Sequence, residues 1–289
     1  MLNMIKLIEC PRDAMQGIKE WIPTNKKVSY INKLLEVGFD TIDFGSFVSP
    51  KAIPQMKDTA EVLSQLILTE DSSKLLTIVA NERGARDAAQ HEEIKYLGYP
   101  FSISETFQLR NTNATIEESL DRVRLIQELC MKYGKEMVVY ISMGFGNPYG
   151  EPWNYEIVEK WIDKLHKLGI NIISISDTIG LAKKSDIELI FTNLIPKYSR
   201  IEFGSHFHTK PDQWFEKVNS AFQSGCKRFD GAILGFGGCP MAKDDLTGNL
   251  PTEKLISFFN SVGVKTNINS LNFESCYNNS LKLFSSLQD

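Results

Sequence analysis

Met137-Val138-Val139-Tyr140-Ile141-Ser142 is a compact apolar run, followed by an amphipathic pattern over Tyr155–Leu168 and a second run at Ile172–Ser176. Short apolar runs of this kind suit strands buried on both faces of a parallel sheet. Gly169 stands between the amphipathic pattern and the second run. A left-handed residue at that position would end a helix. The segment therefore predicts a strand, a helix and a second, parallel strand.

The same unit recurs along the whole chain. The expected strands are Ile5–Glu9, Thr41–Phe44, Leu75–Val79, Lys95–Phe101, Met137–Ser142, Ile172–Ser176, Ile201–Phe207 and Arg228–Ala232. The expected helices are Ser29–Val37, Ile53–Leu66, Gly84–Gln90, Ile116–Tyr133, Tyr155–Leu168, Ser185–Leu194, Gln213–Ser224 and Thr252–Val262. Eight such units predict an α/β protein, a single-domain (β/α)₈ TIM barrel. A doubly wound open sheet is the alternative.

We expect one domain over residues 1–289, with a barrel core of about residues 5–265 and a helical extension after it. Several helix ends carry sequence signals. Ser29 is a candidate N-cap, and Thr115 with Glu118 fits a capping box. Gly38 and Gly225 follow expected helices, as Gly169 does, and predict left-handed C-terminal residues.

Composition excludes several classes of protein. The 289 residues include 32 Lys and Arg against 36 Asp and Glu, so the net charge is 32 − 36 = −4. Weak acidity argues against a nucleic-acid partner, and no apolar run approaches the roughly 18 residues of a membrane span. Five irregularly spaced cysteines indicate free thiols in a reducing compartment. With early charges that leave no room for a signal peptide, we expect a cytoplasmic enzyme.

Two of the four histidines stand together in Ser205-His206-Phe207-His208-Thr209, at the end of the seventh expected strand. On a strand, residues two apart point to the same face. Two imidazoles that converge in this way favour a divalent metal site. The alternative is a pair of core histidines that are satisfied by hydrogen bonds.

Oxygen donors follow other expected strands, at the barrel end where active sites of this fold lie. These strand-end groups are the carboxylates of Asp13, Asp43 and Asp177, the Ser46 hydroxyl and the Asn249 amide. Two imidazoles with such oxygens suit six-coordinate Mg²⁺ or Mn²⁺ better than a tetrahedral structural zinc site. Taken singly, each Asp is better explained as a helix cap or an ion-pair partner, so their shared position at strand ends carries the prediction.

The glycine-rich stretch Gly235-Phe236-Gly237-Gly238-Cys239-Pro240 places a thiol on a loop after the eighth strand. A positioned thiol can act as a general acid and base once neighbouring charges tune its pKa. The alternative is a turn with an incidental cysteine. The other four cysteines look like small apolar fillers of the core: Cys10, Cys130, Cys226 and Cys276.

These motifs, taken in chain order, carry a family resemblance over about residues 5–265. They are Glu9-Cys10-Pro11-Arg12-Asp13-Ala14-Met15-Gln16, Ser46-Phe47-Val48-Ser49-Pro50-Lys51 with Pro54-Gln55-Met56, Asp177-Thr178-Ile179-Gly180, His206-Phe207-His208, Gly237-Gly238-Cys239-Pro240 and Gly248-Asn249. The first resembles an E-x-(G)PRDGLQ opening, and the second is similar to SFVSPKxxPQM. The chain resembles the 3-hydroxy-3-methylglutaryl-CoA (HMG-CoA) lyase family, within the pyruvate carboxyltransferase-like TIM-barrel metallolyases.

The resemblance implies cleavage of (S)-HMG-CoA to acetyl-CoA and acetoacetate by a homodimer that uses Mg²⁺ or Mn²⁺, with Zn²⁺ as a substitute in crystals. It implies that the metal ligands are Asp13, His206, His208 and Asn249. In the same way it assigns enolate stabilisation to Arg12, general acid and base chemistry to Cys239 and assistance in proton transfer to Asp43. Supporting or substrate-contacting roles fall to Gln16, Ser46 and Asp177.

Departures from the family pattern leave the acyl group open. Ala14-Met15 replaces the usual Gly-Leu, and Lys243-Asp244-Asp245 brings charge to a loop that touches substrate in the family. A related 3-hydroxyacyl-CoA is therefore the second substrate. The alternative functions are a condensing synthase of the isopropylmalate or citramalate type, a 2-oxo-acid aldolase and a non-catalytic metal-binding barrel. The Gly-Gly-Cys-Pro loop and the short chain after the eighth helix favour the lyase.

Overall fold

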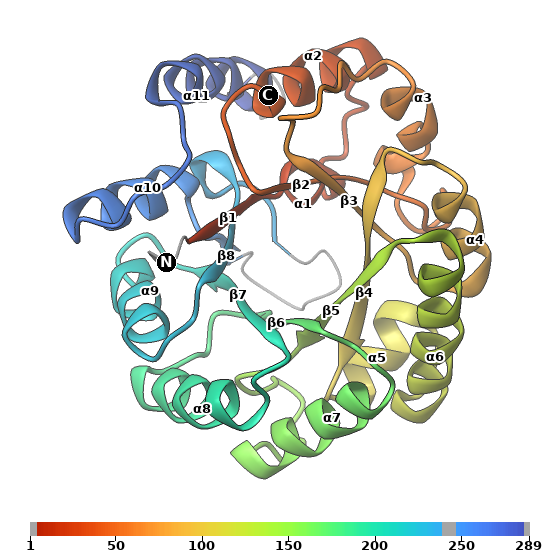
Figure 1. The fold of residues 1–289 in the computed structure, drawn as a ribbon, viewed down its shortest axis with the longest axis vertical. Helices are drawn as coiled ribbons and strands as arrows, with labels where there is room; N and C mark the ends of the chain where they lie inside the picture. The colour runs from red at the N-terminus through yellow and green to blue at the C-terminus, as the bar shows by residue number, and fades with distance from the viewer. Residues whose placement is uncertain (1–4, 239–246, 286–289) are drawn as a thin grey trace.

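The computed structural model describes residues 5–238 and 247–285, and within these ranges eight parallel strands form a closed barrel (Figure 1). The strands are β1 (Lys6–Glu9), β2 (Thr41–Ser46), β3 (Lys74–Ile78), β4 (Ile94–Ser102), β5 (Glu136–Ser142), β6 (Ile172–Asp177), β7 (Glu202–Thr209) and β8 (Arg228–Gly231). Neighbours in the chain pair in order, and β1 pairs with β8, which closes the barrel. The predicted TIM barrel is confirmed, and each predicted strand matches an observed one to within two residues at either end.

A ring of helices covers the outside of the barrel (Figure 1). The helices that follow the strands are α2 (Thr24–Leu35), α3 (Thr59–Leu63), α4 (Glu82–Ala89), α6 (Ile116–Tyr133), α7 (Tyr155–Lys167), α8 (Lys184–Lys197), α9 (Trp214–Gln223) and α10 (Thr252–Ser261). Additional helices are α1 (Pro11–Gln16), α5 (Glu105–Thr112), α11 (Ser270–Ser285) and the 3₁₀ turns Pro54–Met56 and Ile233–Gly235. Of these, α11 lies beside α2, where the Tyr30 and Phe284 rings pack edge to face.

The barrel interior has two chemically different halves. A buried apolar cluster from β3 to β6 fills one half: Leu76, Ile78, Tyr96, Val138, Tyr140 and Ile172. The other half, on β7 and β8, holds the polar side chains of His206, Arg228 and Asp230. Because of this asymmetry, we look for reactive polar groups on the side of the barrel formed by β7, β8 and β1.

Two helix predictions are wrong in detail. Ser29 is not an N-cap, because α2 already begins at Thr24 after Pro23. The first turn of α2 buries Lys27 against Asp58, and a search for apolar spacing does not detect a buried cation. The predicted Ile53–Leu66 helix is interrupted, since a 3₁₀ turn at Pro54–Met56 precedes the short α3.

The other helix-end predictions are confirmed. Thr115 and Glu118 form the predicted capping box at the start of α6. Gly38, Gly169 and Gly225 all have positive φ, at 95°, 82° and 95°, as expected for left-handed residues after helices. None of the helices in the described part of the chain has the length and apolar character needed to cross a membrane.

Candidate active site

The junction between β1 and α1 brings a carboxylate and a guanidinium to the rim of the barrel. Cys10 follows β1 as the N-cap, and Pro11 takes the first helical position, where its missing N–H and fixed φ are favourable. Arg12 and Asp13 therefore lie in the first turn of α1, at the carboxyl end of β1. Glu9 anchors this junction by accepting hydrogen bonds from the Ile233 backbone N–H (2.9 Å) and the Thr252 hydroxyl (2.6 Å).

The end of β7 brings both histidines and Asn249 to the same rim. Asn249 belongs to the two-residue strand β9 (Gly248–Asn249), which pairs antiparallel with β7 and sets Asn249 opposite His208. The Asn249 amide donates hydrogen bonds to Asp13 Oδ2 (2.7 Å) and to the Phe236 carbonyl (2.8 Å). The structure thus brings together all four residues that the family resemblance assigns to the metal.

Asp13, His206 and His208 each offer a ligand atom, and these three atoms lie within 4.8 Å of one another. His208 Nε2 is buried with no hydrogen-bond partner among the described residues, and it lies 3.9 Å from Asp13 Oδ2. The Nδ1 atoms of the two rings are engaged elsewhere, that of His206 by Asp230 (3.2 Å) and that of His208 by the Thr178 carbonyl (2.8 Å). An unpartnered imidazole nitrogen beside a carboxylate fits a divalent cation at this point.

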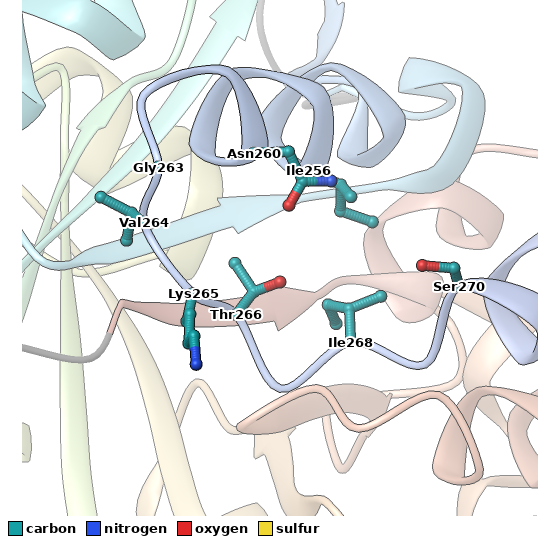
Figure 2. A pocket seen from close by; sticks show the side chains of 8 residues that line it. All are labelled: Ile256, Asn260, Gly263, Val264, Lys265, Thr266, Ile268 and Ser270. Atoms are coloured by element: carbon teal, nitrogen blue, oxygen red, sulfur yellow. The ribbon is translucent and has the colours of Figure 1, made fainter.

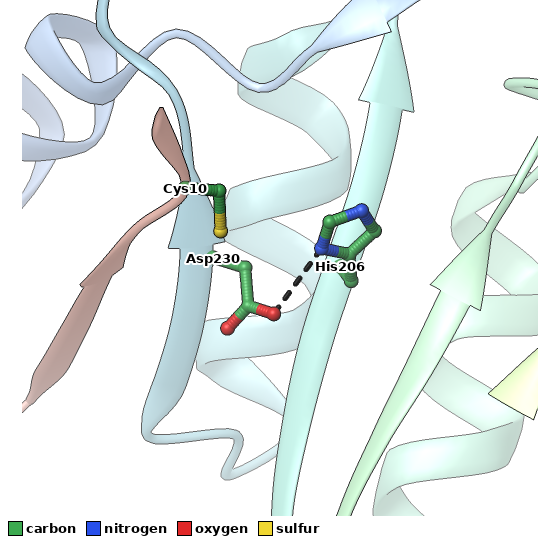
Figure 3. Close-up of side chains that lie close together, drawn as sticks. All are labelled: Cys10, His206 and Asp230. Carbon is green, nitrogen blue, oxygen red and sulfur yellow. Dashed lines mark hydrogen bonds and ion pairs between the residues drawn. The ribbon is translucent and has the colours of Figure 1, made fainter. Parts of the chain in front are cut away.

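A second group of three possible ligands, Cys10, His206 and Asp230, shares His206 with the first (Figure 3). Burial and the charges of surrounding carboxylates raise the pKa of the Cys10 thiol well above its usual value. A neutral thiol is a poor metal ligand, and Asp230 is already hydrogen-bonded to His206. We therefore assign the candidate metal centre to Asp13, His206 and His208.

Arg12 is held by two carboxylates beside this centre. Its Nε and Nη2 donate to Asp43 at 3.0 and 2.6 Å, and Nη1 donates to Asp13 Oδ1 at 2.9 Å. Burial alone would raise the pKa of Asp13, but the charge of Arg12 and, after it, electrostatic interactions with His206 and His208 lower it to about 2. Burial raises the pKa of Asp43 to about 6, and Arg12 offsets only part of this rise. The two carboxylates thus have different proton affinities.

The two histidines also differ. Burial and the neighbouring His206 lower the pKa of His208 to about 4, so His208 is neutral and suited to ligate a metal. For His206, burial favours the neutral form, but the hydrogen bond and charge of Asp230 raise its pKa overall.

The candidate centre opens into a cavity of 420 Å³ that reaches from β7 across β2, β3 and β4 to α5. Arg12, Asp13, Gln16 and both histidines line its inner end, and Asn81, Arg110, Asn111 and Asn113 line the outer part. Gln16 donates to Asp13 Oδ1 (2.6 Å), and the hydroxyl of Ser46 donates to the Ile78 carbonyl (3.2 Å). Both predicted supporting residues therefore border the cavity without completing the ligand group.

Asp177, the third predicted supporting residue, acts on the backbone. It accepts hydrogen bonds from the Leu181 and Ala182 N–H groups and from Lys217 Nζ (2.6 Å). Lys217 also donates to the His208 carbonyl at 3.0 Å. Lys217 thus links the end of β6, through Asp177, to the end of β7, through the His208 carbonyl. These contacts fix the backbone that carries His208.

Cys239 and the Lys243-Asp244-Asp245 stretch lie outside the described residues. The described part of the same loop approaches the candidate centre closely at Gly237, which has a φ of +96°. A Cβ atom on Gly237 would lie 2.5 Å from the Asp13 carbonyl and 2.7 Å from Asn249 Nδ2. The glycine is therefore required by both its conformation and the close packing. The four other cysteines are buried free thiols, as predicted.

Sequence reasoning missed three buried polar residues near the centre. Asp230 is hydrogen-bonded to His206, Lys217 is paired with Asp177, and the Tyr140 ring packs edge-on against His206 with centroids 5.6 Å apart. The available signal was the alternation of polar residues along strands that are otherwise apolar, such as Arg228 and Asp230 on β8.

A second hollow, of 290 Å³, lies between α10 and the segment that leads to α11 (Figure 2). Its lining comes from Ile256, Asn260, Gly263, Val264, Lys265, Thr266, Ile268 and Ser270, none of which is fully buried. This hollow lacks the buried polar groups of the barrel mouth.

A closed (β/α)₈ barrel with an Asp, His, His group at the carboxyl ends of its strands defines a TIM-barrel enzyme with a metal-type active site. The family model described as HMGL-like matches residues 5–278. The chain belongs to this family, which depends on a divalent metal.

Named relatives and solved structures agree with this assignment. A hydroxymethylglutaryl-CoA lyase of Bacillus subtilis is 31% identical over 261 residues, which cover 89% of this chain and 85% of the relative. A mitochondrial one of Arabidopsis thaliana is 32% identical over 267 residues, and the match spans 92% of this chain but only 56% of that relative. An HMG-CoA lyase of Acinetobacter baumannii, solved with coenzyme A and 3-methylmalate, superimposes with a TM-score of 0.91 at 29% identity, covering 99% of this chain and 92% of that one.

Proposed function

We propose that this protein cleaves (S)-HMG-CoA to acetyl-CoA and acetoacetate, with a divalent cation held by Asp13, His206, His208 and Asn249. The observation that carries the proposal is the unpartnered His208 Nε2 at 3.9 Å from Asp13 Oδ2, beside the buried guanidinium of Arg12. The relatives named above support HMG-CoA as the substrate. Mg²⁺ or Mn²⁺ is the expected ion, since nitrogen and oxygen donors are combined.

The cleavage removes the proton of the tertiary hydroxyl, and the carbon–carbon bond breaks as a ketone forms. The bonding electrons pass to the thioester enolate, which is then protonated on carbon. The cation would bind the substrate hydroxyl and lower its pKa. Arg12 supplies a permanent positive charge at the cavity wall. Burial alone would lower the pKa of its guanidinium, but the charges of Asp43 and Asp13 and the hydrogen bond to Asp43 raise the pKa overall and keep the group charged. That charge stabilises the developing enolate.

Two groups are proposed for proton transfer. Asp43, with its pKa raised to about 6, has a proton affinity suited to accepting the hydroxyl proton near neutral pH. It contacts Arg12, so its proton affinity is coupled to the group that stabilises the enolate. Cys239 would donate the proton to the departing carbon.

The acyl-CoA would enter along the cavity, with its acyl end at the cation and its CoA portion toward Asn81, Arg110 and Asn111. These outer residues offer a cation and amide groups, which suit a polar, anionic ligand. A homodimer in the cytoplasm is the expected form of the enzyme. A related 3-hydroxyacyl-CoA is the substrate to compare.

The test is a coupled assay that quantifies acetoacetate and acetyl-CoA formed from HMG-CoA by metal-loaded protein. We expect the two products in a 1:1 ratio, and slower turnover of 3-hydroxyacyl-CoA analogues that lack the 3-methyl group or the terminal carboxylate. Absence of both products from folded, metal-loaded protein would contradict the proposal.

A further inference from the structure

A buried row of charged side chains runs through the barrel beneath the candidate metal centre. Arg228 and Asp230 lie two residues apart on β8, and they are 0% and 1% exposed. The Arg228 side chain passes across Gly204 of β7, where an added Cβ would lie 2.9 Å from Arg228 Cδ. The absence of a side chain at Gly204 leaves room for the aliphatic part of Arg228, which carries the guanidinium inside the barrel.

The two oxygens of the Asp230 carboxylate face different partners. Oδ2 lies 3.2 Å from His206 Nδ1 and accepts a long hydrogen bond from Ser174 (3.5 Å), as Figure 3 shows for the histidine. Oδ1 lies 4.0 Å from Arg228 Nε and has no hydrogen-bond partner among the described residues. One carboxylate oxygen therefore faces a guanidinium without a hydrogen bond, and the other is hydrogen-bonded to an imidazole.

Arg228 also pairs with a carboxylate at the start of β7, on the side away from the candidate centre. Its Nη1 donates to Glu202 at 3.3 Å, and Glu202 also pairs with Lys6 at the opposite end of the barrel from the candidate centre. Charges alternate along this row from Lys6 through Glu202, Arg228 and Asp230, and the row ends at His206. A buried ion pair commonly contributes less to stability than apolar residues of the same volume. A contribution to stability alone therefore explains the buried Arg228 and Asp230 poorly.

We propose that Arg228 and Asp230 are positioning residues for the reaction, in which Arg228 orients the Asp230 carboxylate and Asp230 accepts the Nδ1–H of His206. This arrangement fixes the tautomer in which His206 Nε2 faces Asp13 and His208 as a metal ligand. The inference rests on the metal site proposed above. Neither residue lines the cavity or belongs to the assigned ligand group, so each would act through His206.

The neighbouring His208 shows why His206 needs these two side chains. His208 Nδ1 faces the Thr178 carbonyl at 2.8 Å, and a carbonyl can only accept a hydrogen bond. The backbone therefore fixes the tautomer of His208. His206 has no such backbone partner among its described hydrogen bonds, and its tautomer depends on a carboxylate that Arg228 orients.

The test uses ¹⁵N-histidine NMR on metal-free protein, which reports the tautomer of each ring without requiring activity. The chain has only four histidines, so the His206 and His208 signals can be assigned by substitution. The spectra are recorded at a pH above the raised pKa of His206, where both rings are neutral, and we expect Nδ1–H in both rings of the wild type. In Arg228→Met, the His206 signals should move toward a mixture of tautomers while those of His208 remain, and Arg228→Lys should restore most of the wild-type pattern.

Mn²⁺ binding measured by electron paramagnetic resonance gives the second readout. Arg228→Met should weaken Mn²⁺ binding about 10-fold or more, the range seen when partners of metal-bound histidines are removed. Lys27→Met is the matched control, because it also removes a buried cation from an ion pair, with Asp58, away from the barrel mouth. It should lower the melting temperature without changing Mn²⁺ affinity.

Should Arg228→Met fail to fold, the double variant Arg228→Met, Asp230→Leu removes both buried charges and tests the two residues together. Loss of the Nδ1–H form of His206 in the double variant supports the proposal. Retention of that form, with Mn²⁺ affinity within twofold of the wild type, would overturn it. The NMR result is independent of substrate, so failure of HMG-CoA cleavage would count against the proposed function and not against this inference.

Discussion

At the scale of single residues, neighbouring charges and burial give chemically identical side chains in the candidate site different pKa values. Asp13 and Asp43 both contact Arg12, yet the pKa of Asp13 falls to about 2 and that of Asp43 rises to about 6. Arg12 and the two histidines together lower the pKa of Asp13, whereas at Asp43 the effect of burial is larger than that of Arg12. The first is therefore suited to bind a cation and the second to exchange a proton.

Removing a ligand should affect metal binding before anything else. His208→Ala deletes the unpartnered Nε2, and we expect Mn²⁺ affinity to fall at least about 100-fold, at the upper end of what partners of metal-bound histidines contribute. Isothermal titration with Mn²⁺ measures this. His166→Ala is the control, because this histidine lies near the end of α7 with its ring against Tyr198, and neither residue lines the cavity. An unchanged affinity in His208→Ala would remove His208 from the ligand set.

Removing the guanidinium should affect the reaction more than the metal. Arg12→Gln is expected to lower kcat about 10²- to 10³-fold, the loss typical of a deleted group that stabilises an oxyanion. Mn²⁺ binding should persist, since the Asp13 carboxylate and both imidazoles remain. Steady-state kinetics at saturating Mn²⁺ measures kcat, and a loss smaller than threefold would exclude Arg12 from this role.

At the scale of elements, short connections carry the functional groups to one rim. The predicted strands placed Asp13, His206 and His208 at strand ends correctly, because apolar runs and polar strand ends are local features of the sequence. Asn249 was predicted as an amide donor after the eighth strand, but its place opposite His208 was not, since that depends on the two-residue pairing of β9 with β7. Asp230 and Lys217 were missed for the same reason, because their partners come from other strands.

A substitution at Gly237 tests whether the close packing of the glycine-rich loop against α1 is needed for activity. Gly237→Ala forces a Cβ to within 2.5 Å of the Asp13 carbonyl and should displace Asn249, so we expect most activity to be lost. Gly263→Ala is the matched control, because Gly263 also has a positive φ (+72°) but has nothing within 4 Å of an added Cβ. Both variants should lose about 1–3 kcal/mol of stability from backbone strain. Equal activities would show that the close contact at Gly237 is unimportant.

The raised pKa of Glu9, at the junction of β1, β8 and α10, makes the stability of the protein depend on pH. Burial raises the pKa of Glu9 to about 8 from an ordinary value of 4.5, so the folded protein holds this proton more tightly than the unfolded chain. The contribution of Glu9 to stability is therefore complete below about pH 4.5 and is lost as the pH rises toward about 8. Glu9→Gln keeps a neutral side chain at every pH. Its melting temperature relative to the wild type should rise between pH 5 and pH 9, and a constant difference would contradict the raised pKa.

At the scale of the whole molecule, the fold was predictable because each βα unit carries its own signal and eight of them are consistent with one closed barrel. Wrong details arose where a tertiary contact replaced a local pattern, as at Lys27, whose burial against Asp58 extends α2 ahead of Ser29. The division of the barrel interior into an apolar half and a charged half was likewise not predictable, because it depends on which strands become neighbours.

The central claim is that one divalent cation, bound by Asp13, His206, His208 and Asn249, makes this barrel an HMG-CoA lyase. The most direct test is to titrate chelator-treated protein with Mn²⁺ while following bound Mn²⁺ by electron paramagnetic resonance and acetoacetate formation in the same samples. We predict no turnover without metal and activity that rises in proportion to bound Mn²⁺ until one ion is bound per chain. Full activity in the chelated protein, or none at saturating Mn²⁺, would contradict the claim.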